Sequence, residues 1–122
     1  MKTNRQLLEA AAKAAGISAA WYFGLGMGVE EFSGVPKLWD PLKDDGDAMR
    51  LKVRLHLIVG SYATYTSVTG TYTPGGYEVP NETIVWHHET GGDACAAERL
   101  AITRCAAAIA AAMPAALAVG AA

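Results

Sequence analysis

Apolar positions first recur at the spacing of an α-helix near the start of the chain. A stripe of leucines and alanines follows Thr3, and Gly16 closes it with Ile17 just beyond. Thr3 with Gln6 has the form of a capping box, and a glycine after the last turn is typical of a left-handed C-cap. The pattern predicts a helix over about residues 3–15.

A second helix is predicted over residues 44–55, after the Trp-Asp-Pro-Leu segment at 39–42. Pro41 fixes its own φ and disfavours a helical conformation at the residue before it, so the helix begins after this proline. Apolar residues then recur at helical spacing. We expect Trp39 and Leu42 to anchor the start of the helix, as in a hydrophobic staple.

Three carboxylates, Asp44, Asp45 and Asp47, fall in the first turn of this second helix. Unpaired backbone N–H groups and the positive end of the helix dipole favour negative charge there, so we interpret the aspartates as structural. The alternative is a divalent cation or a cationic ligand. The spacing argues against it, because it lacks the alternating oxygens and terminal bidentate glutamate of a calcium loop.

A third helix is predicted from Asp93, its N-cap, to Pro114, which ends it. Six residues share one face of it: Cys95, Ile102, Cys105, Ala106, Ile109 and Met113. The two cysteines lie about 15 Å apart along the helix and cannot bridge each other. We expect both to be small core residues with free thiols, as in a cytoplasmic protein. Residues 114–122 are expected to form a frayed tail or a short dimer contact.

The stretches between the helices favour β-strands. A short aromatic run at 19–23 precedes a glycine string at 24–28 and the segment from Val29 to Phe32. We expect a strand, a glycine turn and a short returning strand. The glycines could also cradle a phosphate, but no Gly-Lys-Ser/Thr follows them, so a hairpin turn explains them better.

A further hairpin is predicted over 55–68, with its two strands on either side of a Gly60-Ser61 turn. Pro-Gly and Gly-Gly steps then predict a long loop over 70–81, and a last strand is expected over 82–88. Loops of this length are often functional.

Four tyrosines of this region, Tyr62, Tyr65, Tyr72 and Tyr77, are candidate binding residues. Tyrosine buries a large area at low entropic cost and keeps a hydrogen-bonding tip, which suits an interface. The alternative is that these tyrosines cover one face of a half-exposed sheet.

Three histidines, His56, His87 and His88, are candidates for metal or proton chemistry. Successive side chains of a strand point to opposite faces, so His87 and His88 cannot both face one ion from a regular strand. Whether His56 meets either of them depends on the strand order, which the sequence leaves open. A zinc site needs three or four converging ligands, so we expect neither a metal nor a cofactor.

Together these elements predict an α+β fold, in which an antiparallel sheet of three to five strands packs against three helices. A chain of 122 residues is expected to form one domain, 1–122. The net charge of −2 argues against nucleic-acid binding, which needs a basic face. Glu9 and Lys13 stand where a signal peptide would be apolar, and Pro114 interrupts an alanine-rich end that is too short to span a membrane.

Residues 39–51 resemble a signature of small proteins of unassigned function that tailed phages and prophages encode. The signature reads Trp-Asn/Asp-Pro-Leu-x-Asp-Asp-Gly-Asp-Ala-Leu/Met-Arg-Leu, and here the stretch reads Trp-Asp-Pro-Leu-Lys-Asp-Asp-Gly-Asp-Ala-Met-Arg-Leu. The C-terminal helix of that family is similar to the block Gly92-Asp93, Ala96-Ala97, Arg99, Ala101-Ile102, Arg104 and Ala106-Ala107. Residues 62–86 match no pattern of the family, and Lys43 stands where the family often has a threonine. The resemblance implies a phage or prophage setting and supplies no catalytic residue.

No nucleophile beside a base and no convergent set of acids is visible, so we expect no enzyme. The leading hypothesis is a phage- or prophage-derived cytoplasmic protein that binds a host protein through its sheet and the loop 70–81, with counter-defence as one role. One alternative is a small-ligand sponge, for example for a nucleotide signal. Another is a small metal-dependent hydrolase that uses the aspartates with His87 or His88. Assembly into a homo-oligomer stays open.

Overall fold

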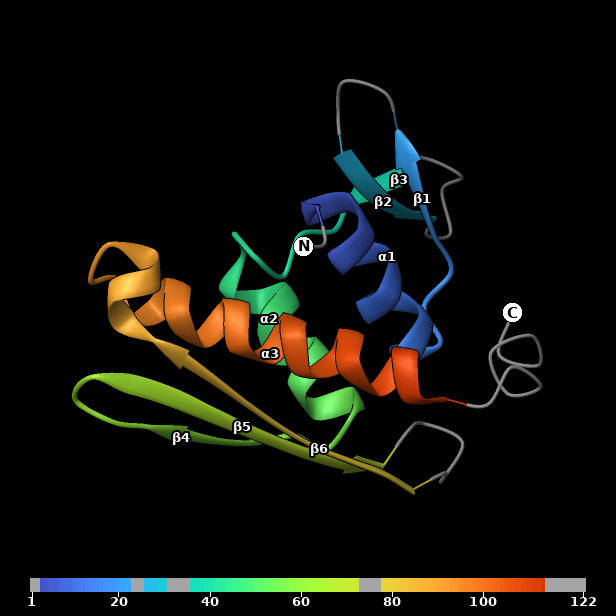
Figure 1. The fold of residues 1–122 in the computed structure, drawn as a ribbon. Helices are drawn as coiled ribbons and strands as arrows, with labels where there is room; N and C mark the ends of the chain where they lie inside the picture. Colours follow the sequence, from blue (N-terminus) through green and yellow to red (C-terminus); the bar gives the residue numbers. More distant parts are fainter. Residues whose placement is uncertain (1–2, 23–25, 31–35, 73–77, 114–122) are drawn as a thin grey trace.

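The computed structural model describes residues 3–22, 26–30, 36–72 and 78–113 (Figure 1). Their elements, in chain order, are α1 (Asn4–Ala15), β1 (Ala19–Tyr22), β2 (Gly26–Glu30), β3 (Pro36–Leu38), α2 (Asp45–Arg54), β4 (Ile58–Ser61), β5 (Tyr65–Tyr72), β6 (Glu78–Trp86), the 3₁₀-helix η1 (His87–Thr90) and α3 (Ala94–Ala112). The strands form two antiparallel sheets, β1-β2-β3 and β4-β5-β6. The predicted α+β fold is confirmed, with the strands divided between two sheets.

The long helix α3 lies in the middle of the molecule. Figure 1 shows α3 across one face of the sheet β4-β5-β6, with α1 on the opposite side of α3 and the small sheet beyond α1. α2 packs beside α3. In the part of the chain that the structure describes, all the helices lie on the same side of the large sheet. Its other face is open to solvent.

α1 begins and ends where the sequence predicts. The Thr3 hydroxyl accepts a hydrogen bond from the Gln6 backbone at 3.2 Å, and the Gln6 side chain accepts from the Thr3 backbone at 3.0 Å. Gly16 has a φ of 68°, and the N–H of Ile17 donates to the Ala12 carbonyl at 2.9 Å. Both the capping box and the left-handed glycine cap are therefore confirmed.

The core between α1, α3 and the large sheet is built mostly from small side chains. Its members include several fully buried alanines, with the larger side chains of Leu51, Leu55, Val68, Val85 and Ile109 among them. Alanine lets two helix backbones approach closely, so the many alanines of α1 and α3 suit their direct contact. The alanine richness of this chain thus serves helix packing.

The first hairpin is confirmed, but its second strand starts earlier than predicted. β1 pairs with β2 in an antiparallel register that sets Trp21 opposite Met27. Gly26 and Gly28 therefore lie within β2 and not in a turn. Gly28 is buried opposite Leu38 of β3, where a small residue suits a close contact.

The predicted Gly60-Ser61 turn is wrong, because both residues belong to β4. The reversal follows at Tyr62, whose N–H donates to the Tyr65 carbonyl at 2.9 Å. A Cβ atom at position 60 would lie 2.9 Å from the Tyr62 ring. Glycine therefore leaves room here for an aromatic ring over the strand.

The predicted long loop over 70–81 is also wrong. β5 continues to Tyr72 and β6 begins at Glu78, with Gly70 opposite Asn81. Only 73–77 separate the strands, and they lie outside the described residues. Gly70 sits under α3, where a Cβ atom would approach a methyl group of Ile109 to 2.9 Å. Its role is close packing, which sequence cannot distinguish from a turn.

The last strand ends at Trp86, so the prediction that His87 and His88 belong to it is wrong. Both histidines lie in η1, where the N–H of His87 donates to the Thr64 carbonyl at 2.9 Å. Asp93 caps α3 as predicted, accepting from the Ala96 N–H at 3.0 Å. α3 ends at Ala112, and the expected tail 114–122 lies outside the described residues.

The two cysteines differ in environment. Cys105 is buried in the core, as predicted, whereas Cys95 is exposed and its prediction as a core residue is wrong. Cys95 stands in the first turn of α3, which leads out of the solvent-exposed turn after η1. The helical spacing shows on which face of the helix a residue lies, but it does not show how far the core extends along that face.

Candidate functional site

The Trp-Asp-Pro-Leu segment seats the start of α2 against the core. Trp39 and Pro41 are buried, and Leu42 packs against the core at its edge. One carboxylate oxygen of Asp40 accepts from the Leu42 N–H at 3.0 Å, and the Asp40 carbonyl accepts from the Asp44 N–H at 2.8 Å. These bonds fix the turn from which the helix leaves.

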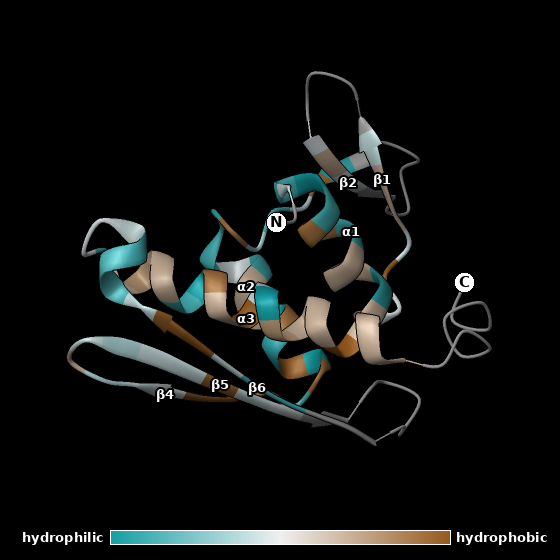
Figure 2. Ribbon diagram, in the orientation of Figure 1, coloured by the Kyte–Doolittle hydropathy of each residue, from teal (hydrophilic) through white to brown (hydrophobic). Residues whose placement is uncertain are grey.

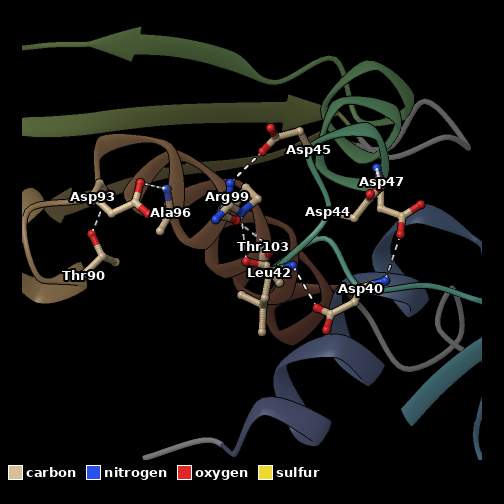
Figure 3. Close-up of polar contacts among 10 residues, drawn as sticks. All are labelled: Asp40, Leu42, Asp44, Asp45, Asp47, Thr90, Asp93, Ala96, Arg99 and Thr103. Atoms are coloured by element: carbon tan, nitrogen blue, oxygen red, sulfur yellow. Dashed lines mark hydrogen bonds and ion pairs between the residues drawn. The ribbon is translucent and has the colours of Figure 1, made fainter. Parts of the chain in front are cut away.

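Asp44 and Asp47 use their carboxylates on the backbone of this same region. Asp44 is the N-cap of α2 and accepts from the Asp47 N–H at 2.8 Å. Asp47 is buried and accepts from the Asp40 N–H at 2.9 Å (Figure 3). It also pairs with Arg50 at 2.8 Å. The bond from the Asp47 N–H to Asp44 serves the backbone of the helix itself, as the sequence predicts. The bond from the Asp40 N–H to Asp47 was not predicted, because it holds the segment that precedes the helix.

Asp45 points away from its own helix, toward α3. Its carboxylate pairs with Arg99 at 2.6 Å, and the Arg99 Nε donates to the Leu42 carbonyl at 3.0 Å (Figure 3). Arg99 therefore joins α3 to the start of α2. The sequence did not assign this role. No local pattern could have indicated it, because Asp45 and Arg99 lie 54 positions apart in the sequence.

The acidic side chains at the start of α2 thus make structural contacts that connect α2 to α3 and to the segment before it. Asp44, Asp45 and Asp47 all have partners within the protein. No group of three His, Cys, Asp or Glu side chains in the described residues is arranged to hold a metal ion. His56 lies in the exposed connection after α2 at a φ of 53°. His87 belongs to η1, and its Nε2 is buried without a hydrogen-bond partner.

The outer face of the large sheet carries an aromatic row that crosses the end of the sheet near α3's start. The rings of Tyr62 and Tyr65 stack with their centroids 4.7 Å apart and their planes 19° from parallel. The Tyr65 ring then meets Trp86 at 5.1 Å, in a tilted arrangement. Tyr65 and Trp86 are opposite each other on β5 and β6. We call Tyr62, Tyr65 and Trp86 the aromatic row.

Aliphatic side chains extend this apolar surface. Ile84 stands two residues before Trp86, so alternation places both on the outer face, where they are 44% and 47% exposed. Ile58 of β4 is 72% exposed and Tyr62 is 53% exposed. Among the outer-face side chains that the structure describes, Glu82 is the only charged one. The outer face is therefore nearly uncharged, and its exposed apolar side chains flank the hydroxyl side chains of Ser67 and Thr69 on β5.

Val68 and Val85 of the same strands point the other way and are fully buried under the helices. Figure 2 shows apolar segments within the strands of this sheet. Antiparallel sheets with one solvated face usually alternate apolar and polar residues. This sheet departs from that rule on its outer side.

The structure brings together two of the four predicted tyrosines. Tyr62 and Tyr65 stack on the outer face, whereas Tyr77 and the side chain of Tyr72 lie outside the described residues. Trp86 and the two isoleucines were missed. The period-two spacing of Ile84 and Trp86 could have indicated them, had the strand not been extended to His88.

A second feature is an open groove of about 640 Å³ between β3 and α2. Its apolar walls include the exposed side chains of Leu38, Met49 and Val53. Its acidic group, Asp47, is already engaged by Arg50 and by backbone. The groove therefore offers mainly apolar contact.

Comparisons of this chain with protein-family models, with curated proteins and with solved structures find no match. Among the described residues, no helix is both long enough and apolar enough to cross a membrane. Support for a function therefore comes from the geometry of the outer face and from the pattern of residues 39–51.

Proposed function

We propose that this chain is a non-enzymatic, phage-derived protein that binds a host protein in the bacterial cytoplasm through the outer face of the sheet β4-β5-β6. Counter-defence, by occupying that host protein, is the role we propose for it. The observation that carries the proposal is the exposed aromatic row of Tyr62, Tyr65 and Trp86 with Ile58 and Ile84 beside it.

An exposed, contiguous apolar patch is costly for a soluble domain, and such patches mark interaction sites. Tyrosine and tryptophan are also the residues that contribute most to binding energy at protein interfaces. Here the rings of Tyr62 and Tyr65 stack, and the Tyr65 ring meets Trp86 in a tilted arrangement. These mutual contacts restrain the three side chains, so less side-chain entropy is lost when a partner covers them.

The chemistry of the face indicates the kind of partner. Glu82 is its only charged side chain among those described, so electrostatic steering contributes little. A partner with a flat, apolar patch and hydrogen-bonding groups for the tyrosine hydroxyls fits best. We expect binding to change little with ionic strength, because charge pairs are few.

The acidic start of α2 supports a binding role over the hydrolase alternative. The carboxylates of Asp44, Asp45 and Asp47 bond to backbone N–H groups and arginines. A metal ion would have to displace these structural contacts in order to bind. The sponge alternative would need convergent polar groups around a cavity. The outer face has few polar groups.

Affinity purification from bacterial lysate with matched variants tests this proposal. Ile84→Glu places a charge in the middle of the outer face, and Val53→Glu makes the same change at an exposed apolar site on α2. We expect one stoichiometric protein partner with the wild type and with Val53→Glu. Burying an unpaired carboxylate should weaken binding by Ile84→Glu at least about tenfold.

Circular dichroism of both variants checks that they remain folded, and a salt series checks the charge argument. Retention of the same partner by Ile84→Glu would contradict the proposed surface. Recovery of a heat-released small molecule in place of a protein would favour the sponge.

A further inference from the structure

The edges of the large sheet differ in how they are protected. The strand order β4-β5-β6 makes β4 and β6 the edges within the described residues. The sequence of β6 includes a proline, which has no N–H to donate, and the exposed Glu82, and proline and charge are the usual protection against edge pairing. β4 reads Ile-Val-Gly-Ser and has neither. An edge without these features can pair with another strand.

The hydrogen bonds of β4 show which of its backbone groups face the open edge. The Tyr62 N–H bonds to the Tyr65 carbonyl, so this pair is of the hydrogen-bonded kind. Hydrogen-bonded and non-bonded pairs alternate along an antiparallel ladder. Gly60 therefore bonds to β5, whereas Val59 and Ser61 direct their N–H and C=O groups outward.

We propose that β4 pairs antiparallel with β4 of a second copy of this chain, about a two-fold axis at Gly60. In this register Val59 exchanges both backbone hydrogen bonds with Ser61 of the second copy, and Ser61 does so with Val59 of that copy. The four outward backbone groups of each strand are then satisfied. The two three-stranded sheets become one continuous six-stranded sheet.

The side chains of this register are self-complementary. On the outer face Ile58 stands opposite Tyr62 of the second copy, in a non-hydrogen-bonded pair where side chains approach closest. These are the two most exposed apolar side chains of the β4 hairpin, at 72% and 53%. Gly60 faces Gly60, which leaves room for the Tyr62 ring that lies over each glycine.

A second copy fits this edge better than an unrelated strand. The four residues of β4 carry no charge, so a two-fold axis brings no like charges together. Pairing also joins the two outer faces into one apolar surface. The pairing uses the edge of the sheet and does not depend on host-protein binding, so either proposal can fail alone.

Sedimentation equilibrium over a range of protein concentrations tests the pairing. We expect the wild type to dimerise reversibly. Ile58→Glu, at a side chain that is exposed in the single chain, should weaken the dimer at least tenfold. Ile84→Glu makes the same change on the same face but away from β4, and we expect it to leave the dimer unchanged. Thermal unfolding of both variants checks that each remains folded.

Amide hydrogen exchange read residue by residue locates the interface. The amides of Val59 and Ser61 should gain protection as concentration rises, whereas that of Gly60 is already bonded to β5 and should change less. A wild type that stays monomeric, a dimer that Ile84→Glu disrupts as much as Ile58→Glu, or exchange at Val59 and Ser61 that is independent of concentration would each overturn the proposal.

Discussion

Asp45 and Asp47 lie two positions apart on α2 and differ in burial. The Asp47 side chain is 8% exposed and bonds to the Asp40 backbone, whereas that of Asp45 is 80% exposed and pairs with Arg99 at the surface. Sequence indicates a shared role for the two, because both stand in the first turn of a helix. It does not show which one is covered by the preceding segment.

Asp47→Ala should therefore destabilise the protein more than Asp45→Ala. Removing Asp47 leaves a part-buried N–H of Asp40 without its acceptor, which costs about 1–3 kcal/mol. Removing Asp45 breaks an ion pair with one exposed partner, worth less than about 1 kcal/mol. Urea unfolding measures both values. Equal losses would show that the Asp40–Asp47 bond contributes little.

The two cysteines allow a second test at the residue scale. Burial raises the pKa of the Cys105 thiol, and the thiolate is the reactive form, so Cys105 should react slowly in the native protein. Cys95 is exposed and should react fast with a thiol reagent. We expect one fast thiol in the wild type and none in Cys95→Ser, until denaturant releases Cys105. Two fast thiols in the native protein would contradict the burial of Cys105.

At the scale of elements, the helix ends were predicted well because their signals are local. Thr3 with Gln6, Gly16, Asp44 and Asp93 each act within one turn of their own helix. The turns were predicted less well. Gly60 and Gly70 look like turn glycines, but both lie within strands. Gly70 packs against Leu57 and Ile109, which are distant from it in sequence, whereas the ring over Gly60 belongs to nearby Tyr62.

Gly70→Ala tests the close contact between β5 and α3. The new Cβ would lie 2.7 Å from a Leu57 methyl and 2.9 Å from an Ile109 methyl, so we expect overpacking to cost about 1–3 kcal/mol. Ile109→Val removes one of the two obstacles. The double variant should lose less stability than the sum of the single ones in urea unfolding. Simple additivity would show that the strand shifts to admit the methyl.

The turn that joins β6 to α3 depends on Glu89. Its carboxylate accepts from the Trp86 N–H at 2.9 Å and pairs with Arg104 at 3.2 Å. The backbone hydrogen bond, followed by the arginine, lowers the pKa of Glu89 below its usual range. A lowered pKa in the folded state adds stability above the ordinary pKa, and this stability is lost as pH falls through the lowered value.

Glu89→Gln should therefore lower the melting temperature at about pH 7 and have no effect at about pH 2, where the protonated glutamate and the glutamine amide are both neutral. The expected loss is below about 1 kcal/mol, because the ion pair is partly exposed. Thermal unfolding at several pH values measures it. A difference that persists at the acid end would indicate a packing effect in place of an ionic one.

At the scale of the whole molecule, all the described helices lie on one side of the large sheet and the aromatic row lies on the other (Figure 1). The α+β class followed from the periodicities of the sequence. The division into two sheets did not, since strand pairing over long distances has no local signal. Two of the candidate tyrosines lie on the outer face of the large sheet. The tryptophan and isoleucines beside them emerged only once the strand register was known.

The most direct test of the binding role is oxidative footprinting of the protein alone and in complex with its purified partner. We expect Trp86 and Tyr62 to be protected in the complex, while Trp21, exposed on the small sheet, serves as an internal control and stays unchanged. Protection of Trp21 or of Met49 in the groove beside α2, with Trp86 still reactive, would contradict the outer face as the binding surface.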